Sequence, residues 1–482
     1  MKHYRLQNFI LLALVFNIFI APAIWNGFPL IFTDSLSYLT SGIDLVAPVD
    51  RPIFYGLFIR ISNLIMDLGG LVLFQAALVI FLLLKLAAIL LPNLSIRISL
   101  LWLCFIGMMT SVSWFVGQIS PDIFTSCLFL TMIILALIFE QASLRCIALL
   151  VGLLILEICM HSGNLIIGFM FFLYILGLSW IQKKSWSYIK RFSVIMMTSF
   201  VISFSAIVVS NAIFHQGVTF NRWGKVIFLA RILEDGFGLQ YLNSICVTES
   251  LKTCAALPLF NEAAKKEVEL GLMANPVLKN LVLNALLWDG GINAIGGLTI
   301  LNSEAGSIIN GAIQAYPSQM GYAFANNSLD QFKTFSVGNQ FGSTAHLLAM
   351  NSLFKSYFPG SYQSYIHSHQ YTGTVNLVTN ILNPVYTMTV ILSGFFILAV
   401  GCLSFKSQSC LVRVCKISST KLVIFSLIGF LIINAMVTGG ISAVFDRYQG
   451  RVIWLIPAIS FLFAIELIKQ QYKTPVNYFD KD

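Results

Sequence analysis

The sequence predicts an all-α membrane protein with about ten transmembrane helices and a large external domain between the seventh and eighth. Of its 482 residues, 57% are hydrophobic and only 10% are charged, whereas soluble domains average about 45–50% apolar and about 25% charged residues. A polar interval, 215–383, separates two sets of apolar runs that are long enough to cross a bilayer. These observations exclude water-soluble and disordered classes.

Ten apolar runs approach the roughly 20 residues that a helix needs to cross a hydrocarbon core about 30 Å thick. They divide the chain into a first membrane region, 1–214, the external interval, and a second membrane region with a tail, 384–482. The run 52–66 contains Arg60, so we interpret it as a helix lying in the membrane interface rather than as an eleventh span. The predicted spans are 7–27, 71–91, 97–116, 121–140, 146–160, 164–181, 192–214, 384–404, 422–440 and 451–469.

The Lys and Arg residues predict the orientation of the spans, because cytoplasmic loops carry an excess of them. With the N-terminus inside, only Arg51, Arg60, Arg447 and Arg451 fall in short outer loops. Both termini are then cytoplasmic and the first outer loop, 28–70, is external, as expected of a multi-pass protein of an inner (cytoplasmic) membrane. The residues assigned to the inner side are Lys2, Arg5, Arg97, Arg145, Lys183, Lys184, Lys190, Arg191, Lys406, Arg413, Lys416, Lys421, Lys469, Lys473 and Lys481.

The first run has a second interpretation as a signal peptide. Ala21-Pro22-Ala23 imitates a cleavage site after a basic start. We favour an uncleaved span. Residues from 28 onward are external in either case, so the position of the first outer loop does not depend on this choice.

The external interval is long enough for a small folded domain. Its only cysteines, Cys246 and Cys254, are eight positions apart, and an oxidising exterior favours a disulfide between them over two free thiols. The nine cysteines of the chain show no metal-ligand spacing, so we expect no metal centre. The segment 225–241 gathers apolar residues on one helical face, which predicts an amphipathic helix on the outer leaflet. These residues are Val226, Leu229, Leu233 and Phe237.

Ionisable residues gather at the outer ends of the predicted spans. Charge is expensive inside a bilayer, so such residues are the main functional signal in this class of protein. A helical turn beginning at Asp34 would bring Tyr38 onto the same face. The residues are Asp34, Tyr38 and Arg51 in the first outer loop, Asp122 at the start of the fourth span, His161 after the fifth span, and Arg447, Tyr448 and Arg451 in the last outer loop.

Several of these residues have alternative structural roles. Asp122 follows a proline and could cap its helix, which is worth about 0.3–1 kcal/mol through the helix dipole. His161 could satisfy a backbone carbonyl. Arg447 and Arg451 could anchor in lipid headgroups, although basic residues are disfavoured on this side. A structural role is hardest to assign to Asp34, which lies among apolar and hydroxyl residues.

These residue types suit group transfer from a lipid phosphate at the outer leaflet. A carboxylate such as Asp34 would take the proton of an attacking hydroxyl. Arginines would bind the leaving phosphate, because a guanidinium matches phosphate oxygens bidentately and keeps its charge. The candidate catalytic residues are Asp34 and Asp122, and the candidate substrate-binding residues are Tyr38, Arg51, His161, Arg447, Tyr448 and Arg451.

The order of these features resembles the GT-C superfamily of polyprenyl-phosphate-sugar-dependent glycosyltransferases, in particular the protein O-mannosyltransferase and lipid A aminoarabinose transferase branch. The local matches are the acidic first outer loop, SPDIFTSCLFL at 120–130 and FDRYQGRVIWLIPA at 445–458. The resemblance implies a GT-C-like fold, Asp34 as the general base, a polyprenyl-phosphate-linked sugar donor, and a lipid, glycan or protein acceptor. Members usually carry an acidic pair in the first loop. Here Ser35 replaces the second acid, which leaves the base assignment and a divalent cation cofactor open.

Two other functions stay open. A polysaccharide polymerase or ligase acting on a lipid diphosphate would also use outer arginines, but it has no obvious need for Asp34. A transporter or lipid flippase would need ionisable or broken-helix positions near mid-membrane, and only Lys85 and Glu157 lie well within predicted spans. Nucleic acid is not an expected partner, because the basic residues follow the membrane topology.

Overall fold

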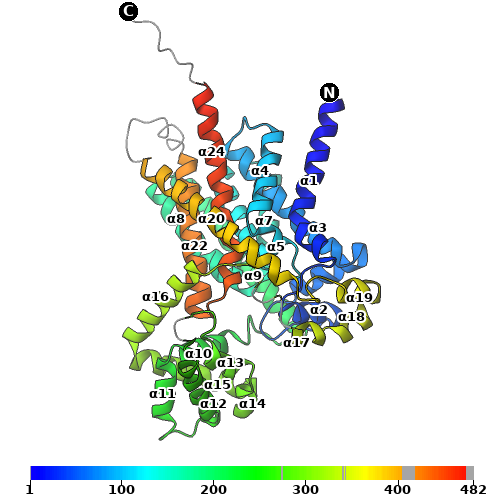
Figure 1. The fold of residues 1–482 in the computed structure, drawn as a ribbon. Coiled ribbons are helices and arrows are strands. Elements are labelled where there is room, and N and C mark those ends of the chain that lie inside the picture. The colour runs from blue at the N-terminus through cyan, green and yellow to red at the C-terminus, as the bar shows by residue number, and fades with distance from the viewer. Residues whose placement is uncertain (1, 273–274, 339–340, 342–343, 404–417, 474–482) are drawn as a thin grey trace, which may run out of the picture.

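The computed structural model describes residues 2–272, 275–338, 341, 344–403 and 418–473. Within them it contains helices and one isolated β-bridge but no strand, and seven helices are long and apolar enough to cross a membrane. The chain is therefore an all-α multi-pass membrane protein (Figure 1). The expected basic inner loop with Lys406, Arg413 and Lys416 lies outside the described residues. The seven candidate spans lie in α1 (Lys2–Asn26), α3 (Phe54–Leu90), α8 (Ser162–Ile181), α9 (Trp186–Ile213), α20 (Val375–Leu403), α22 (Ser418–Ile441), and α23 (Asp446–Ile453) taken together with α24 (Leu455–Lys473).

Three further predicted spans form shorter apolar helices. In place of the predicted span 97–116, extended backbone at Thr110 separates α4 (Ile96–Met109) from α5 (Val112–Val116). The other two are α6 (Ile123–Ile138) and α7 (Leu144–Met160). Nearly every side chain of α6 is buried, so protein surrounds this helix on all sides and it forms the centre of the bundle.

The long helix α3 is broken near its middle. Met66 and Asp67 have non-helical dihedral angles, and Asp67 has a positive φ of 59°. The Asp67 carboxylate accepts a hydrogen bond from the Leu68 N–H at 2.7 Å, which satisfies the first N–H group after the break. The break thus separates the predicted interfacial segment, 52–66, from the predicted span, 71–91. Apolar side chains before the break are exposed, as suits a helix lying at a membrane surface; they are Ile61, Leu64 and Ile65.

The polar interval 215–383 has two parts, of which the first, with the helices between 224 and 315, is called the interval domain below. Its first part forms a hydrophobic core of its own, at the end of the molecule opposite the first turns of α1 (Figure 1). Its last part, with α17 (Thr344–Ala349), α18 (Asn351–Tyr357) and α19 (Pro359–Ile366), joins the main core formed by the membrane helices. The separate core is built from α10 (Gly224–Glu234), α11 (Phe237–Ile245), the 3₁₀ turn η1 (Lys252–Ala256), α12 (Leu257–Glu269), α13 (Leu281–Leu287), α14 (Gly291–Ile295) and α15 (Leu298–Ala315).

The prediction of one outer-leaflet helix over 225–241 is wrong. Gly236, with φ of 88°, separates α10 from α11, so the segment forms two helices. Its apolar face is buried in the core of the interval domain, and Arg231 is buried as well, paired with Asp235 at 2.6 Å. The helical period reveals an apolar face but does not say whether lipid or protein covers it.

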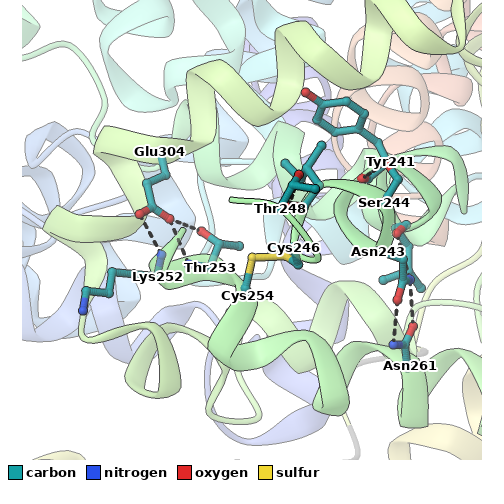
Figure 2. The surroundings of a disulfide bond; sticks show 12 residues. Tyr241, Asn243, Ser244, Cys246, Thr248, Lys252, Thr253, Cys254, Asn261 and Glu304 are labelled. Carbon is teal, nitrogen blue, oxygen red and sulfur yellow. Dashed lines mark hydrogen bonds between the residues drawn. A yellow bond between two sulfur atoms is a disulfide. The ribbon is translucent and has the colours of Figure 1, made fainter. Parts of the chain in front are cut away.

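A disulfide joins Cys246, at the end of α11, to Cys254 in η1 (Figure 2). Beside it, the Glu304 carboxylate of α15 accepts hydrogen bonds from the N–H groups of Lys252 and Thr253 at 2.8 and 2.9 Å. Backbone donors that a short turn leaves unpaired are thereby satisfied. Covalent and polar links therefore hold the segment between α11 and α12 against the core.

Two buried acidic side chains hold the start of α13. Glu234 accepts hydrogen bonds from the N–H groups of Val282 and Leu283, both at 3.0 Å, and Glu267 accepts one from Leu281 at 2.6 Å. Burial, followed by the neighbouring charge of Glu267, raises the pKa of Glu234 to about 7. The pair satisfies N–H groups that the start of any helix leaves without backbone partners.

Helix α16 (Pro317–Lys333) connects the interval domain to the membrane helices by packing along α22. The contact is close because α22 has glycines there. A Cβ atom on Gly439 would lie 2.5 Å from the Asn327 carbonyl oxygen, and one on Gly440 would lie 2.5 Å from the ring of Phe324. Only glycine lets the two helices approach to this distance.

Candidate functional site

Asp34 lies where the loop after α1 joins the segment before α6. Leu30 and Ile119 pair through their backbones at 2.8 Å. Ser35, the first residue of α2 (Ser35–Asp44), donates a hydrogen bond to the Ile119 carbonyl at 2.6 Å and accepts one from the Phe32 N–H at 2.8 Å. The serine at the position of the expected second acid thus fixes the loop and holds Asp34 in place.

Two arginines from distant parts of the chain engage Asp34. Its Oδ2 atom accepts a hydrogen bond from Arg447 Nη1 at 2.8 Å, and its Oδ1 atom lies 3.3 Å from Arg51 Nη2. Burial alone would raise the pKa of Asp34, but the charges of Arg51 and Arg447 outweigh it and hold this pKa well below the usual range. Asp34 is therefore ionised and ion-paired on both oxygens.

Other groups hold the same two arginines. Arg51 donates from Nε to Asp50 at 2.8 Å and lies over the Tyr38 ring at 4.9 Å. The Arg447 guanidinium lies 4.2 Å from the centre of the Phe32 ring and 4.9 Å from that of Tyr448. Cation–π contacts with flanking aromatic rings favour these guanidinium positions.

A second, more deeply buried pair lies beside the first. Arg451 Nη1 donates to Asp122 Oδ1 at 2.8 Å, and the two side chains are 1% and 3% exposed. Ser120 donates to the other Asp122 oxygen at 2.8 Å, and Arg447 Nη1 lies 4.0 Å from that oxygen. Asp122 occupies the N-cap position of α6 but makes no side-chain capping bond, so its carboxylate serves the ion pair instead of a capping hydrogen bond. Arg447 therefore connects the two ion pairs into one cluster.

His161 lies near this cluster but contributes to local structure. Its Nδ1 accepts a hydrogen bond from the Gly163 N–H at 3.1 Å and caps α8. Burial, reinforced by the charge of Arg451, lowers the pKa of His161 to about 3, so the imidazole is neutral at physiological pH. The three carboxylates at the site thus face three guanidiniums and a neutral imidazole.

Each of the three arginines keeps a buried nitrogen without a partner. These atoms are Nη1 of Arg51, Nε of Arg447 and Nε of Arg451. Buried polar groups are almost always hydrogen-bonded, so an orphan donor calls for an explanation. Three of them in one cluster indicate unused capacity to bind an anion.

A cavity of about 490 Å³ borders the cluster through Phe32 and Arg447. This volume falls in the range of small-molecule sites. Aromatic rings line it, including Phe341, and so do polar groups such as Gln118. The interval domain contributes Asn275, Val277 and Leu278, so the cavity lies between the membrane helices and this domain.

The sequence brought most of this cluster to attention but missed some members. Asp50, Phe32 and Ser120 were not candidates. Two of the three had a signal in the sequence: Ser120 directly precedes the Pro-Asp motif, and Asp50 directly precedes Arg51. Nothing marked Phe32 among other apolar residues. In the described part of the chain, no group of three or more His, Cys, Asp or Glu side chains is arranged to hold a metal ion.

Comparisons with known protein families, with curated proteins and with solved structures found no match. The features of the chain that bear on function are the cluster around Asp34 and the cavity beside it.

Proposed function

We propose that this chain is an integral membrane glycosyltransferase that moves a sugar from a polyprenyl-phosphate donor to an acceptor at the outer face of the membrane. The observation that carries the proposal is the cluster itself. A carboxylate lies between two arginines that keep unpartnered N–H groups, beside a cavity with aromatic and amide walls. A lipid-phosphate sugar needs both an anion site and space for an uncharged polar ring.

The proposal includes the finer topology. Beyond the seven long helices, α4, α6 and α7 complete ten spans, and the part of α3 before Asp67 lies in the interface. Both termini are then cytoplasmic, and the cluster with its cavity is on the outer face of the cytoplasmic membrane. The opposite placement of α1's first turns and the external domain supports this orientation (Figure 1).

In the proposed reaction, the bond between the sugar's anomeric carbon and the phosphate oxygen breaks, and that carbon bonds to the acceptor oxygen. Asp34 takes the proton from the acceptor hydroxyl. The polyprenyl phosphate leaves with the bonding electron pair, and Arg51 and Arg447 stabilise its charge. We assign a positioning role to Asp122 and Arg451, because their pair is nearly inaccessible.

Donor binding tests the arginine role. Purified chain in nanodiscs is titrated with a polyprenyl-phosphate hexose. Loss of a charge-assisted hydrogen bond costs about 1.5–3 kcal/mol, so Arg447→Ala should weaken binding by about ten- to a hundredfold. Arg447→Lys should weaken it less, because it keeps the charge and loses only the planar fork. Arg60→Ala is the matched control, since Arg60 donates to backbone carbonyls of α2 and not to the cluster. Equal binding by wild type and both Arg447 variants would contradict the proposal.

Transfer rate tests the base. Asp34→Asn keeps the size of the side chain but removes the basic oxygen, so transfer of labelled sugar to membrane acceptors should fall by about 10²–10⁴-fold. A well-folded Asp34→Asn protein that keeps more than about a tenth of the wild-type rate rules out the base assignment.

A further inference from the structure

The carboxylate assigned as the base and the phosphate of the donor need the same two guanidiniums. In the chain without ligand, Arg51 and Arg447 already have an anion between them, and that anion is Asp34. Both Asp34 oxygens are engaged, so its capacity to accept a proton is low in this arrangement. The residue is in place but is held in a weakly basic form.

We propose that Asp34 occupies the place of the donor phosphate until the donor arrives, so that phosphate binding displaces the carboxylate and thereby frees the base. This inference rests on the proposed function and adds an order to it: donor first, acceptor deprotonation second. The carboxylate and the phosphate compete for one arginine pair.

Arg51 and Arg447 keep other contacts when Asp34 leaves. Arg51 remains bonded to Asp50 and lies over Tyr38, and Arg447 remains between the rings of Phe32 and Tyr448. Each also keeps its buried unpartnered nitrogen. An incoming phosphate therefore meets positioned donors and does not have to order them, which favours binding.

Asp34 has the most exposed charged side chain of the cluster. Its side chain is 26% exposed, against 13% for Arg51 and 19% for Arg447. It precedes α2 at the N-cap position but makes no side-chain capping bond, so its release breaks no cap. The only bonds that the carboxylate gives up are those that the phosphate replaces.

The displacement also raises the basicity of the Asp34 carboxylate. The charges of Arg51 and Arg447 are what hold the pKa of Asp34 below its usual range. A phosphate that neutralises these charges removes that effect, while burial continues to favour the protonated acid. Asp34 then takes the proton from the hydroxyl of the sugar acceptor more readily, because the donor phosphate has neutralised the two arginines.

A binding experiment tests this competition without a sugar or an acceptor. Full-length chain in nanodiscs is titrated with farnesyl phosphate, and farnesol reports on the isoprenoid alone. Because Asp34→Asn removes the competing anion, it should tighten farnesyl phosphate binding by about tenfold or more and leave farnesol unchanged. Asp44→Asn is the matched control, since Asp44 is the other carboxylate of the α2 segment, at its far end, and should leave both affinities unchanged.

The outcomes separate the two proposals. Equal or weaker farnesyl phosphate binding by Asp34→Asn overturns the competition while leaving the glycosyltransferase proposal standing. Wild type that binds farnesyl phosphate no better than farnesol overturns both. If Asp34→Asn fails to fold, carbodiimide labelling of wild-type Asp34 followed by mass spectrometry decides the matter. Carbodiimide reacts with the protonated acid, so labelling should rise with farnesyl phosphate and not with farnesol, and an unchanged level overturns the inference.

Discussion

Removing one member of the Asp122–Arg451 pair should destabilise the fold strongly. The charged atoms are 2.8 Å apart and the side chains are 3% and 1% exposed, so neither charge reaches water when its partner is lost. Breaking a buried pair from one side costs about 3–5 kcal/mol. Arg451→Met should fall near the lower end, because Asp122 still has Ser120 and a more distant Arg447. Asp122→Leu should fall near the upper end.

Unfolding in mixed detergent micelles measures these costs. The double variant with both substitutions should recover part of the loss, giving a coupling energy of at least about 1 kcal/mol in a double-mutant cycle. The exposed pair Lys265–Glu269, at 3.5 Å, is the control: Lys265→Met should cost only about 0.3–0.5 kcal/mol. Single variants at Asp122 and Arg451 that cost under about 1 kcal/mol, or that add without coupling, would refute the reasoning.

Three further predictions concern the interval domain and the topology. Because the pKa of Glu234 is raised, the folded chain keeps this proton at pH values where the unfolded chain has lost it. The free energy of unfolding should therefore fall as pH rises from about 4.5 to about 7. Hydrogen exchange at α13 should speed up over this range in wild type but not in Glu234→Gln. Replacing Cys246 and Cys254 by serine should cost about 2–3 kcal/mol for so short a loop, and an unchanged unfolding midpoint of the domain would count against it. Cysteine introduced at Ser185 should be labelled only from the inside and at Ala325 only from the outside; labelling of both from one side would contradict the ten-span topology.

The sequence carried enough information to find the charged residues of the site but not their pairing. Arg447 and Arg451 stood out because basic residues are disfavoured in outer loops. Which of them engages Asp34 and which engages Asp122 depends on contacts across more than 300 positions, and no local pattern encodes these. The helical period also does not show what covers an apolar face. The sequence therefore predicts lipid against the apolar face of 225–241, whereas the structure buries this face in a protein core.

The glycine contact between α16 and α22 lies beside the chain segment that leads to the arginines of the cluster. Gly439 and Gly440 set the two helix axes at the limit of backbone approach, and the chain runs from them within a few residues to α23, which carries Arg447 and Arg451. Gln331 of α16 exchanges hydrogen bonds with the backbone N–H and carbonyl of Phe445, both at 2.9 Å, directly before α23. A methyl group at either glycine should separate α16 from α22, and we therefore expect it to displace the guanidiniums of α23 without contacting them.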